Sequence, residues 1–398
     1  SLIFTKAWRR REAELALQAG MSDFEREEDV RLKYKLTHCL RRSAVTGIPE
    51  YGRQPASEMQ FRRVVSLLIT SLAIVAVLAV NAGLYVAKIL MEKSSIDFFR
   101  LNYQNIFSVV LSVGIALINQ AGAAVAAILA EYENHRTQTD FEDSLIYKIF
   151  FIQFISSYGS LAYTAFLAQS VEGGCGSIDC FSELRQLVAI VLLERLIRTI
   201  VLDNILPTYM AKRRFLNETK GVDASKMSKA ETEYILDPFD VQSEIINRFM
   251  NQVILFGFVV LFVPAFPMAP LLGALSIVIE VREFGYTLLF RMQRNNPRGV
   301  QDIGSFEGCF KMVAYSAVAS NSALIFFSMH HDFAASLPGG NTGVVCFFFG
   351  CQALIFLFVR LALASFSDVT APVSTQLERL EFVRENLRGI ERHPDLES

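Results

Sequence analysis

A stripe of hydrogen-bonding side chains runs through one of the most apolar parts of the sequence. In the stretch FIQFISSYGSLAYTAF, which begins at Phe151, polar residues recur at helical spacing. The members of the stripe are Gln153, Ser156, Ser157, Ser160 and Tyr163. Residues three, four and seven apart lie on one face of an α-helix. Such a face is unfavourable against lipid tails, so we expect it to contact other helices or water.

The preceding apolar segment carries a similar stripe, with Ser108, Ser112 and Asn119 spaced by four and seven. One interpretation is structural, because small polar residues commonly form hydrogen bonds between neighbouring membrane helices. Two consecutive segments with matching stripes favour the other interpretation, a polar groove. All the polar residues of both stripes are therefore candidate groove-lining residues.

Charged residues interrupt two further apolar segments. They are Glu194, Arg195, Arg198 and Asp203 in AIVLLERLIRTIVLDNIL, and Glu280, Arg282 and Glu283 in SIVIEVREFGY. A charge at the centre of a membrane helix costs about 2.5–3.5 kcal/mol, whereas a Leu or Ile returns only about 0.5 kcal/mol. We therefore expect both segments to face other helices or a watery cavity. Ionisable groups inside a membrane are functional candidates by default, and structural ion pairs are the alternative.

The composition predicts the setting of these side chains. The chain has 398 residues, of which 52% are hydrophobic, and a mean hydropathy of +0.34. The formal charge of -2 gives no reason to expect a nucleic-acid partner. Several uncharged runs reach the length of about 20 residues that a bilayer requires. The sequence therefore predicts an all-α, polytopic membrane protein.

Eight hydrophobic segments are predicted to be transmembrane helices. They cover residues 64–87, 104–130, 146–168, 185–206, 249–264, 269–290, 308–328 and 343–366. Pro264, Pro267 and Pro270 cluster between the fifth and sixth segments. Because three such close prolines cannot continue one helix, we expect a helical hairpin with a short turn there.

The distribution of Lys and Arg predicts the orientation. Residues 9–63 and 208–248 are rich in both, whereas 170–184 and 329–342 contain neither. By the positive-inside rule, we expect 9–63 to be a cytosolic basic loop and 367–398 a cytosolic C-terminal helix. Residues 1–8 read as the end of a transmembrane helix. Since the sequence starts with Ser, we expect it to be a fragment that lacks an N-terminal part.

Cysteine, histidine and motif usage gives no support for an enzyme. Cys175 and Cys180 lie in a predicted exoplasmic loop, where they are either a disulfide or two free thiols. The adjacent His330 and His331 also lie in such a loop, where solvated side chains are the expected state. The sequence contains no Walker loop, dinucleotide fingerprint, HExxH motif or nucleophile elbow.

Several stretches closely resemble the anoctamin family of calcium-activated chloride channels and phospholipid scramblases. They are HRTQTDFEDSLIYKIFFIQFISSYGSLAYTAF from His135, GFVVLFVPAFPMAPLLGAL from Gly257, QDIGSF from Gln301 and WRRREAELA from Trp8. The resemblance implies spans three to ten of a ten-span fold, without the N-terminal cytosolic domain and the first two spans. It also implies a homodimer, each protomer with its own polar groove lined by spans three to seven.

The sequence departs from the family at the calcium site. Alignment with the family places Thr199, Asp203, Asn251 and Glu280 at ligand positions, and Arg248 and Phe284 where acidic residues are usual. Calcium takes six to eight oxygen ligands, usually including several carboxylates. The resemblance therefore implies calcium, but this degraded ligand set argues against two-ion binding. We hypothesise that Arg248 acts as a tethered cation paired with Asp203 or Glu280, which would make the conduit calcium-independent.

The preferred functional interpretation is a passive conduit for phospholipids between leaflets. The alternatives are a chloride or non-selective ion channel, and a non-conducting tether or scaffold. Phospholipids and ions such as chloride are thus the expected partners. The residues are equally compatible with the plasma membrane and an endomembrane.

Overall fold

The structure is a computed structural model of the chain. It describes residues 2–22, 24–37, 40–42, 47, 49–51, 55–92, 97–168, 180–219, 227–295, 297–329 and 340–391. Long helices dominate: α4 (Ala56–Glu92), α5 (Asp97–Glu133), α6 (Gln138–Ala162), α8 (Cys180–Arg198), α11 (Val241–Val260), α12 (Ala269–Phe290), α13 (Phe306–Ala323), α15 (Gly340–Ala364) and α16 (Ala371–Glu391). Shorter helices are α1 (Leu2–Gln18), α2 (Phe24–Glu27), α3 (Leu32–Thr37), α9 (Leu206–Glu218) and α10 (Lys229–Tyr234).

Three of the helices pass into π-helical turns, in which the backbone hydrogen bonds span one residue more than in an α-helix. The turns are η1 (Tyr163–Leu167) after α6, η2 (Thr199–Ile205) after α8 and η4 (Leu324–Met329) after α13. A small antiparallel hairpin joins β1 (Leu40–Arg42) to β2 (Pro49–Tyr51), with Leu40 opposite Tyr51. Apart from this hairpin, the described residues confirm the predicted all-α class.

The eight predicted segments all lie largely within helices, but several helices are longer than their apolar parts. Hydropathy marks only the apolar part of a helix, whereas α4 and α5 continue past both predicted ends. Among the described residues, five helices are long and apolar enough to cross a membrane: Ala56–Glu92, Ile106–Glu133, Gln138–Leu167, Phe306–Phe326 and Thr342–Ala364. The helices α8, α11 and α12 fall outside this set. Charged residues interrupt each of them, among them Arg195 of α8, Arg248 of α11 and Glu283 of α12. The count of eight spans therefore stays a prediction.

The proline cluster separates α11 from α12, as predicted. α11 ends at Val260, and the Leu261 N–H still bonds to the Gly257 carbonyl. A turn over residues 261–268 contains Pro264 and Pro267, and Pro270 lies in the first turn of α12. Proline is tolerated in a first helical turn because its missing N–H has no intrahelical partner there.

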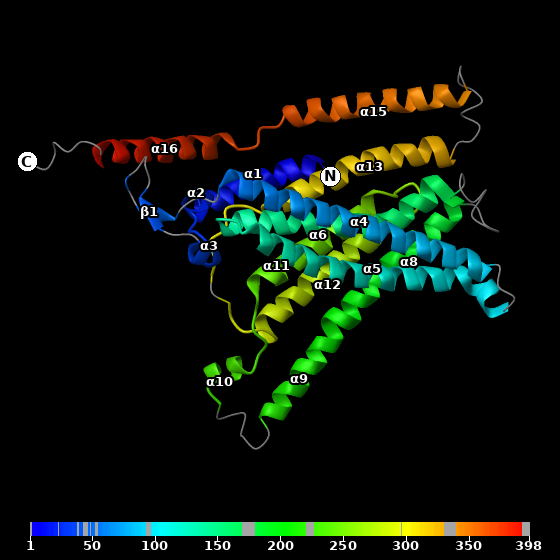
Figure 1. Cartoon of the computed structure of the whole chain (residues 1–398), viewed down its shortest axis with the longest axis horizontal. Helices are drawn as coiled ribbons and strands as arrows, with labels where there is room; N and C mark the ends of the chain where they lie inside the picture. Colours follow the sequence, from blue (N-terminus) through cyan, green and yellow to red (C-terminus); the bar gives the residue numbers. More distant parts are fainter. Residues whose placement is uncertain are drawn as a thin grey trace, which may run out of the picture.

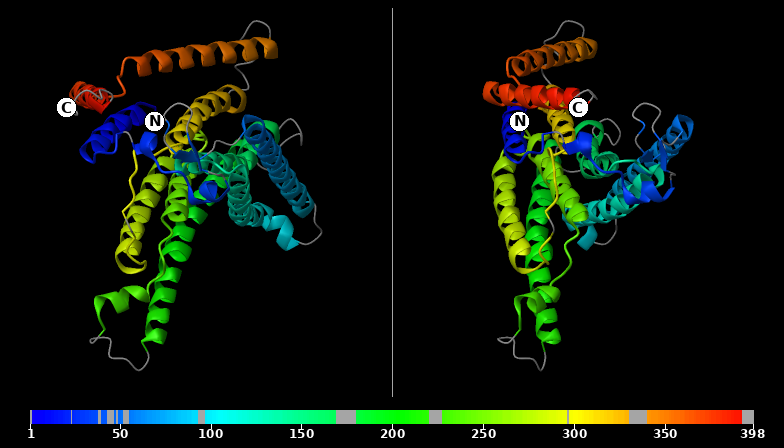
Figure 2. Two further views of the ribbon diagram at one scale, coloured as in Figure 1. Left: turned by 60° about the vertical axis from the view of Figure 1, so that its left-hand side comes forward. Right: turned by 90° about the vertical axis from the view of Figure 1, so that its left-hand side faces the viewer.

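Figure 1 shows how the helices are arranged. α4, α5, α6 and α13 run along the long axis, α15 lies at one outer edge, and α9 projects obliquely from the bundle. Both views in Figure 2 again show α9 projecting and α15 on the opposite side. α2, α3 and α16 lie toward the left of Figure 1 and α1 runs toward them from the middle, whereas α4 ends and α15 begins at the right. This grouping fits a single cytosolic side, which stays a prediction.

The predicted basic loop over 9–63 contains more structure than expected. α1 runs from Leu2 to Gln18, straight through the predicted membrane boundary at residue 8, and α2, α3 and the hairpin follow. WRRREAELALQ consists largely of residues with high helix propensity, which explains the continuation. The predicted C-terminal segment contains the helix α16, and its cytosolic side stays a prediction.

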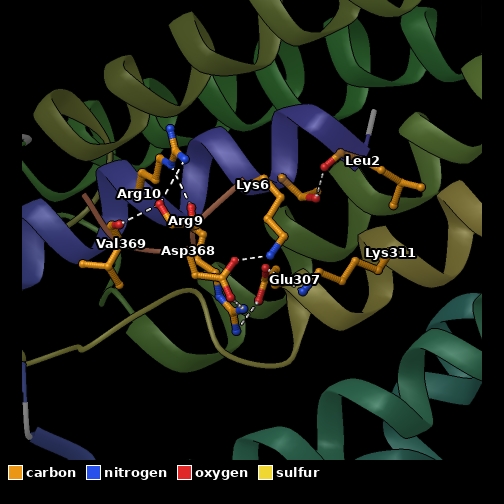
Figure 3. Close-up of polar contacts among 10 residues, drawn as sticks. Leu2, Lys6, Arg9, Arg10, Glu307, Lys311, Asp368 and Val369 are labelled. Atoms are coloured by element: carbon orange, nitrogen blue, oxygen red, sulfur yellow. Dashed lines mark hydrogen bonds and ion pairs between the residues drawn. The ribbon is translucent and has the colours of Figure 1, made fainter. Parts of the chain in front are cut away.

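Ion pairs attach α1 to the C-terminal part of the chain (Figure 3). Lys6 and Arg9 both contact the carboxylate of Asp368, between α15 and α16. Arg9 also lies 3.5 Å from the Glu307 carboxylate in α13, which pairs with Lys311 at 2.8 Å. The start of the described chain is thereby held against its C-terminal region.

Candidate functional site

The polar stripe of α6 is buried in the helix bundle. Ser156, Ser157 and Ser160 are at most 1% exposed, and Gln153 is 9% exposed. Tyr163 is half-buried at the start of the π-helical turn η1. In this conformation the stripe packs between helices, which is the structural interpretation of the pattern. A water-filled groove would require these helices to separate.

A matching polar face on α4 packs against the α6 stripe. Ser66, Thr70, Asn81, Tyr85 and Lys88 are all buried. The Tyr85 hydroxyl donates to the Ser160 carbonyl at 2.8 Å and lies 2.5 Å from the Thr164 hydroxyl. This face was not among the predicted groove-lining residues, although its polar residues recur at helical spacing inside an otherwise apolar segment.

Polar residues of α5 complete the layer. Ser108 and Ser112 are 1% and 3% exposed, and Asn119 is half-buried. The Ser112 hydroxyl donates to the Val109 carbonyl of its own helix at 2.9 Å. α5 packs on α4, α6 and α8. We call the buried polar side chains of α4, α5 and α6 the polar layer.

Several groups of the polar layer lack a protein hydrogen bond. Among the described residues, the hydroxyls of Ser156, Ser157 and Ser160 and both polar atoms of the Asn81 amide have no partner. Leaving a buried polar group unpaired costs about 1–3 kcal/mol. The packed conformation therefore contains hydrogen-bonding capacity that water or a polar ligand would satisfy.

A buried ion pair lies at one end of the polar layer. Lys88 of α4 is 2.5 Å from a carboxylate oxygen of Glu183 in α8, and both side chains are at most 4% exposed. The ammonium also lies 5.7 Å from the ring centres of Tyr85 and Phe107. An ion pair this well buried is costly to break, because either charge alone would be left in a medium of low dielectric.

The charged residues of the later helices form a second cluster, centred on Glu283 of α12. One carboxylate oxygen of Glu283 accepts a hydrogen bond from Arg248 of α11 at 2.7 Å. The other accepts from Arg291 at 3.0 Å and from the Thr287 hydroxyl at 2.6 Å. Glu283 is 3% exposed. We call Arg248, Glu283, Thr287 and Arg291 the arginine–glutamate cluster.

The predicted partners of Arg248 are therefore wrong. Arg248 pairs with Glu283, and at 3.5 Å with Glu244, instead of Asp203 or Glu280. The reason lies in helix geometry, because Glu283 is nearly one helical turn past Glu280 on α12. The Arg248 guanidinium also stacks 4.2 Å from the ring centre of Phe284, a cation–π contact.

The four predicted calcium positions have different environments. Glu280 accepts from the Gln252 amide at 2.6 Å. Asn251 accepts a hydrogen bond from Arg195 through its main-chain carbonyl. Thr199 and Asp203 lie in the π-helical turn η2.

Arg291 links η2 to the arginine–glutamate cluster, because it donates to the Asp203 carbonyl at 3.1 Å. Arg291 was not among the predicted site residues. Its position eight residues after Glu283, on the same helical face, is the signal that could have found it.

These residues do not fit a calcium site of the family type. Calcium needs several free carboxylate or carbonyl oxygens around one point. Both oxygens of Glu283 are held by arginines, and one oxygen of Glu280 is held by Gln252. Within the part of the chain that the structure describes, no three His, Cys, Asp or Glu side chains are close enough to hold a metal ion.

Some predicted positions lie outside the described residues. Cys175, His330 and His331 are among them. Cys180 is disulfide-bonded. The pairing of Cys180 with Cys175 stays a prediction.

The chain is similar to known proteins over most of its length. The family model described as "Anoctamin: Calcium-activated chloride channel" matches residues 1–380. Mouse Anoctamin-7 is 27% identical over 354 residues, which are 82% of this chain and 41% of the relative. Mouse Anoctamin-3 is 25% identical over 354 residues, 81% of this chain and 35% of the relative. Human Anoctamin-4 is 24% identical over 353 residues, 81% of this chain and 37% of the relative.

Proposed function

This chain belongs to the anoctamin family, and we propose that its polar layer is the closed form of a path for phospholipid headgroups between leaflets. It is an integral membrane protein of a family of channels and scramblases, not enzymes. The chain spans about two-fifths of the length of these relatives. The activity of the whole protein is therefore part of the proposal, as is the homodimer that the resemblance implies.

The observation that carries the proposal is the set of unpaired polar groups between α4, α5 and α6. A purely structural layer would gain by pairing its hydroxyls or replacing them with alanine. Three serine hydroxyls and the Asn81 amide instead stay unpaired within the described part of the bundle. Water or a headgroup that enters between the helices would form hydrogen bonds with these groups. Such bonds lower the free energy needed to separate the helices.

The arginine–glutamate cluster supports conduction without calcium. In a calcium-bound site, the metal supplies the positive charge that holds carboxylates of different helices together. Here Arg248 connects α11 to Glu283 of α12, and Arg291 connects the same carboxylate to the Asp203 carbonyl of η2. Arginine keeps its charge at every physiological pH. The opening of the path is therefore proposed to need no metal.

A matched pair of triple variants tests this function. Full-length protein in liposomes with a fluorescent phospholipid would be exposed to dithionite, which bleaches only the outer leaflet. Ser156→Ala, Ser157→Ala and Ser160→Ala together should slow excess bleaching by about tenfold or more, because the path loses three hydrogen-bonding groups. A triple variant at Ser71, Ser322 and Ser365, which lie outside the stripe, should bleach like the wild type.

The same liposomes separate the alternatives. Chloride efflux without lipid transfer would favour the ion-channel interpretation. The absence of both lipid transfer and ion flux would favour a tether or scaffold. Lipid transfer that is equal in both triple variants would overturn the assignment of the path to the α6 stripe.

A further inference from the structure

A cavity of about 350 Å³ lies apart from the polar layer, where α2 and the first turns of α6 and α11 meet the segment after α12. Thr139 and Ile146 come from α6, Val241 and Phe249 from α11, and residues 298–304 close the cavity. Pockets of 300–1,000 Å³ with mostly apolar walls and a few polar groups are typical small-molecule sites. This volume suits a small organic molecule.

The apolar wall of the cavity is rich in aromatic rings. Phe24 of α2, Phe249 of α11 and Phe306 of α13 all line it. Phe249 and Phe306 stack with ring centres 5.0 Å apart and planes 26° apart. Aromatic faces attract organic cations, because the ring quadrupole is negative above and below the plane.

The polar wall of the same cavity is acidic. Glu25, Glu142, Asp143 and Asp302 line it, and Arg298 is the single basic residue among the lining residues. Arg298 already pairs with Glu142 at 2.7 Å, which leaves the other three carboxylates without a basic residue in the lining. The site therefore favours a positively charged ligand.

The N-terminus of α6 does not reverse this preference. The N-terminus of α6 is capped by Thr137, whose hydroxyl accepts from the Asp140 N–H at 3.2 Å. The Glu28 carboxylate accepts from the Thr139 N–H at 3.2 Å. The chain's own oxygen atoms thus already occupy the positive end of α6, and a bound anion would meet further carboxylates.

A metal ion is a poorer occupant than an organic cation. No cluster of three acidic, His or Cys side chains within the described residues is tight enough for a metal. Asp143 accepts from the Ser305 hydroxyl and Asp302 from the Gly304 N–H, both at 2.6 Å. These carboxylates are spread around the wall, and two of them already accept hydrogen bonds. Such an arrangement suits an ammonium group better than a metal ion.

From these features we propose that the cavity binds a protonated amine attached to a small aromatic or aliphatic body. The ammonium lies among Glu25, Asp143 and Asp302, and the apolar body lies against the phenylalanine rings. The site does not depend on the lipid-transfer proposal. Because Phe249 adjoins Arg248 on α11, an occupant also contacts the helix that carries the arginine–glutamate cluster.

Equilibrium dialysis with radiolabelled phenethylamine tests the proposal on full-length protein in lipid nanodiscs. We expect saturable binding that excess unlabelled amine displaces. The matched neutral and anionic molecules, 2-phenylethanol and 3-phenylpropionate, should displace it at least about tenfold less well, because they lack the charge-assisted contact. Glu25→Gln should weaken amine binding by about tenfold. Glu14→Gln, an equivalent change on α1 away from the cavity, should leave binding unchanged.

A second variant separates loss of charge from loss of the cavity. Ile245 of α11 also lines the cavity. Ile245→Trp adds bulk there and should abolish amine binding, with the size-exclusion profile of the wild type. Equal displacement by the amine and the alcohol would overturn the proposal. So would amine binding that neither Glu25→Gln nor Ile245→Trp changes in folded protein. Lipid transfer has no part in either result, so this proposal and the proposed function can fail separately.

Discussion

Arg248 and Glu283 form a 2.7 Å ion pair between α11 and α12, and Glu283 is almost completely buried. Arg291 holds the second oxygen of the same carboxylate. One buried negative charge is thus shared by two arginines, Arg248 of α11 and Arg291 directly after α12. This arrangement gives the chain a fixed positive charge at the place where the family resemblance implies calcium ligands.

Removal of Arg248 should destabilise the helix bundle. Breaking a buried ion pair typically costs 3–5 kcal/mol, and we expect about 2–3 kcal/mol for Arg248→Met because Arg291 still contacts Glu283. Thermal unfolding of the purified protein in detergent measures the change. Arg282→Met on the exposed face of α12 is the control. An unfolding midpoint of Arg248→Met equal to that of the control would contradict a stabilising role for the pair.

Gly257 is required by the close approach of α6 to α11. The Tyr158 hydroxyl donates to the Ile254 carbonyl at 2.5 Å, and a methyl group at Gly257 would lie 1.9 Å from the same hydroxyl oxygen. Gly257→Ala should therefore cost about 1–3 kcal/mol through overpacking. Gly285→Ala on α12, where nothing lies within 4 Å, should be neutral or stabilising. Thermal unfolding of both variants would test the contact, and equal midpoints would refute it.

The stability of the junction between α1 and the C-terminal region should depend on pH through Asp368. The hydrogen bond from Lys6 holds the pKa of Asp368 below its ordinary value of 3.8. Because the folded state favours the carboxylate, its contribution is present above that value and is lost as pH falls through the lowered pKa. Asp368→Asn should speed hydrogen exchange of α16 at neutral pH. The loss of local stability should stay below about 1 kcal/mol, because the Lys6 and Asp368 side chains are 21% and 43% exposed.

The matched control for this junction is Glu381→Gln on the exposed face of α16. It should exchange like the wild type at every pH. The difference between Asp368→Asn and the wild type should shrink as pH falls below 3.8 and through the lowered pKa of Asp368, because the wild-type carboxylate then becomes protonated. A difference that persists unchanged into acid would contradict the assignment to the carboxylate.

Helix positions were largely predictable from the sequence, because hydropathy and proline are local signals. The α11–α12 turn follows directly from Pro264 and Pro267. The partner of Arg248 was not predictable, because it depends on the rotation of α12 relative to α11. Whether Arg248 meets Glu280 or Glu283 depends on a rotation of α12 by less than one turn, which no local sequence pattern determines.

The polar faces of α5 and α6 were predictable from the sequence, but their contacts with α4 were not. The periodicity of Ser156 and Ser160 showed that one face of α6 is polar. It could not show what that face contacts, and the structure packs it against Tyr85 and Asn81 of α4. The cavity beside Phe249 depends on loops that are distant in sequence, so no motif indicated it.

Amine binding in the cavity should depend on pH through Glu25. Burial, with the carboxylates of Asp302, Asp143, Glu28 and Asp140, raises the pKa of Glu25 above its ordinary value of 4.5. A bound ammonium favours the ionised carboxylate, so phenethylamine affinity should increase as pH rises through this raised pKa. Dialysis over a pH series measures the change. Glu25→Gln should flatten the profile, and an unflattened profile would assign the dependence to another group.

Lipid transfer with and without calcium tests the central claim most directly. Full-length wild-type protein in liposomes with a fluorescent phospholipid would be bleached with dithionite, first in EGTA and then with calcium. The arginine–glutamate cluster predicts bleaching past the one-leaflet limit in EGTA, at a rate that calcium leaves unchanged. Bleaching past that limit only with calcium would contradict a path whose positive charge is supplied by Arg248 and Arg291.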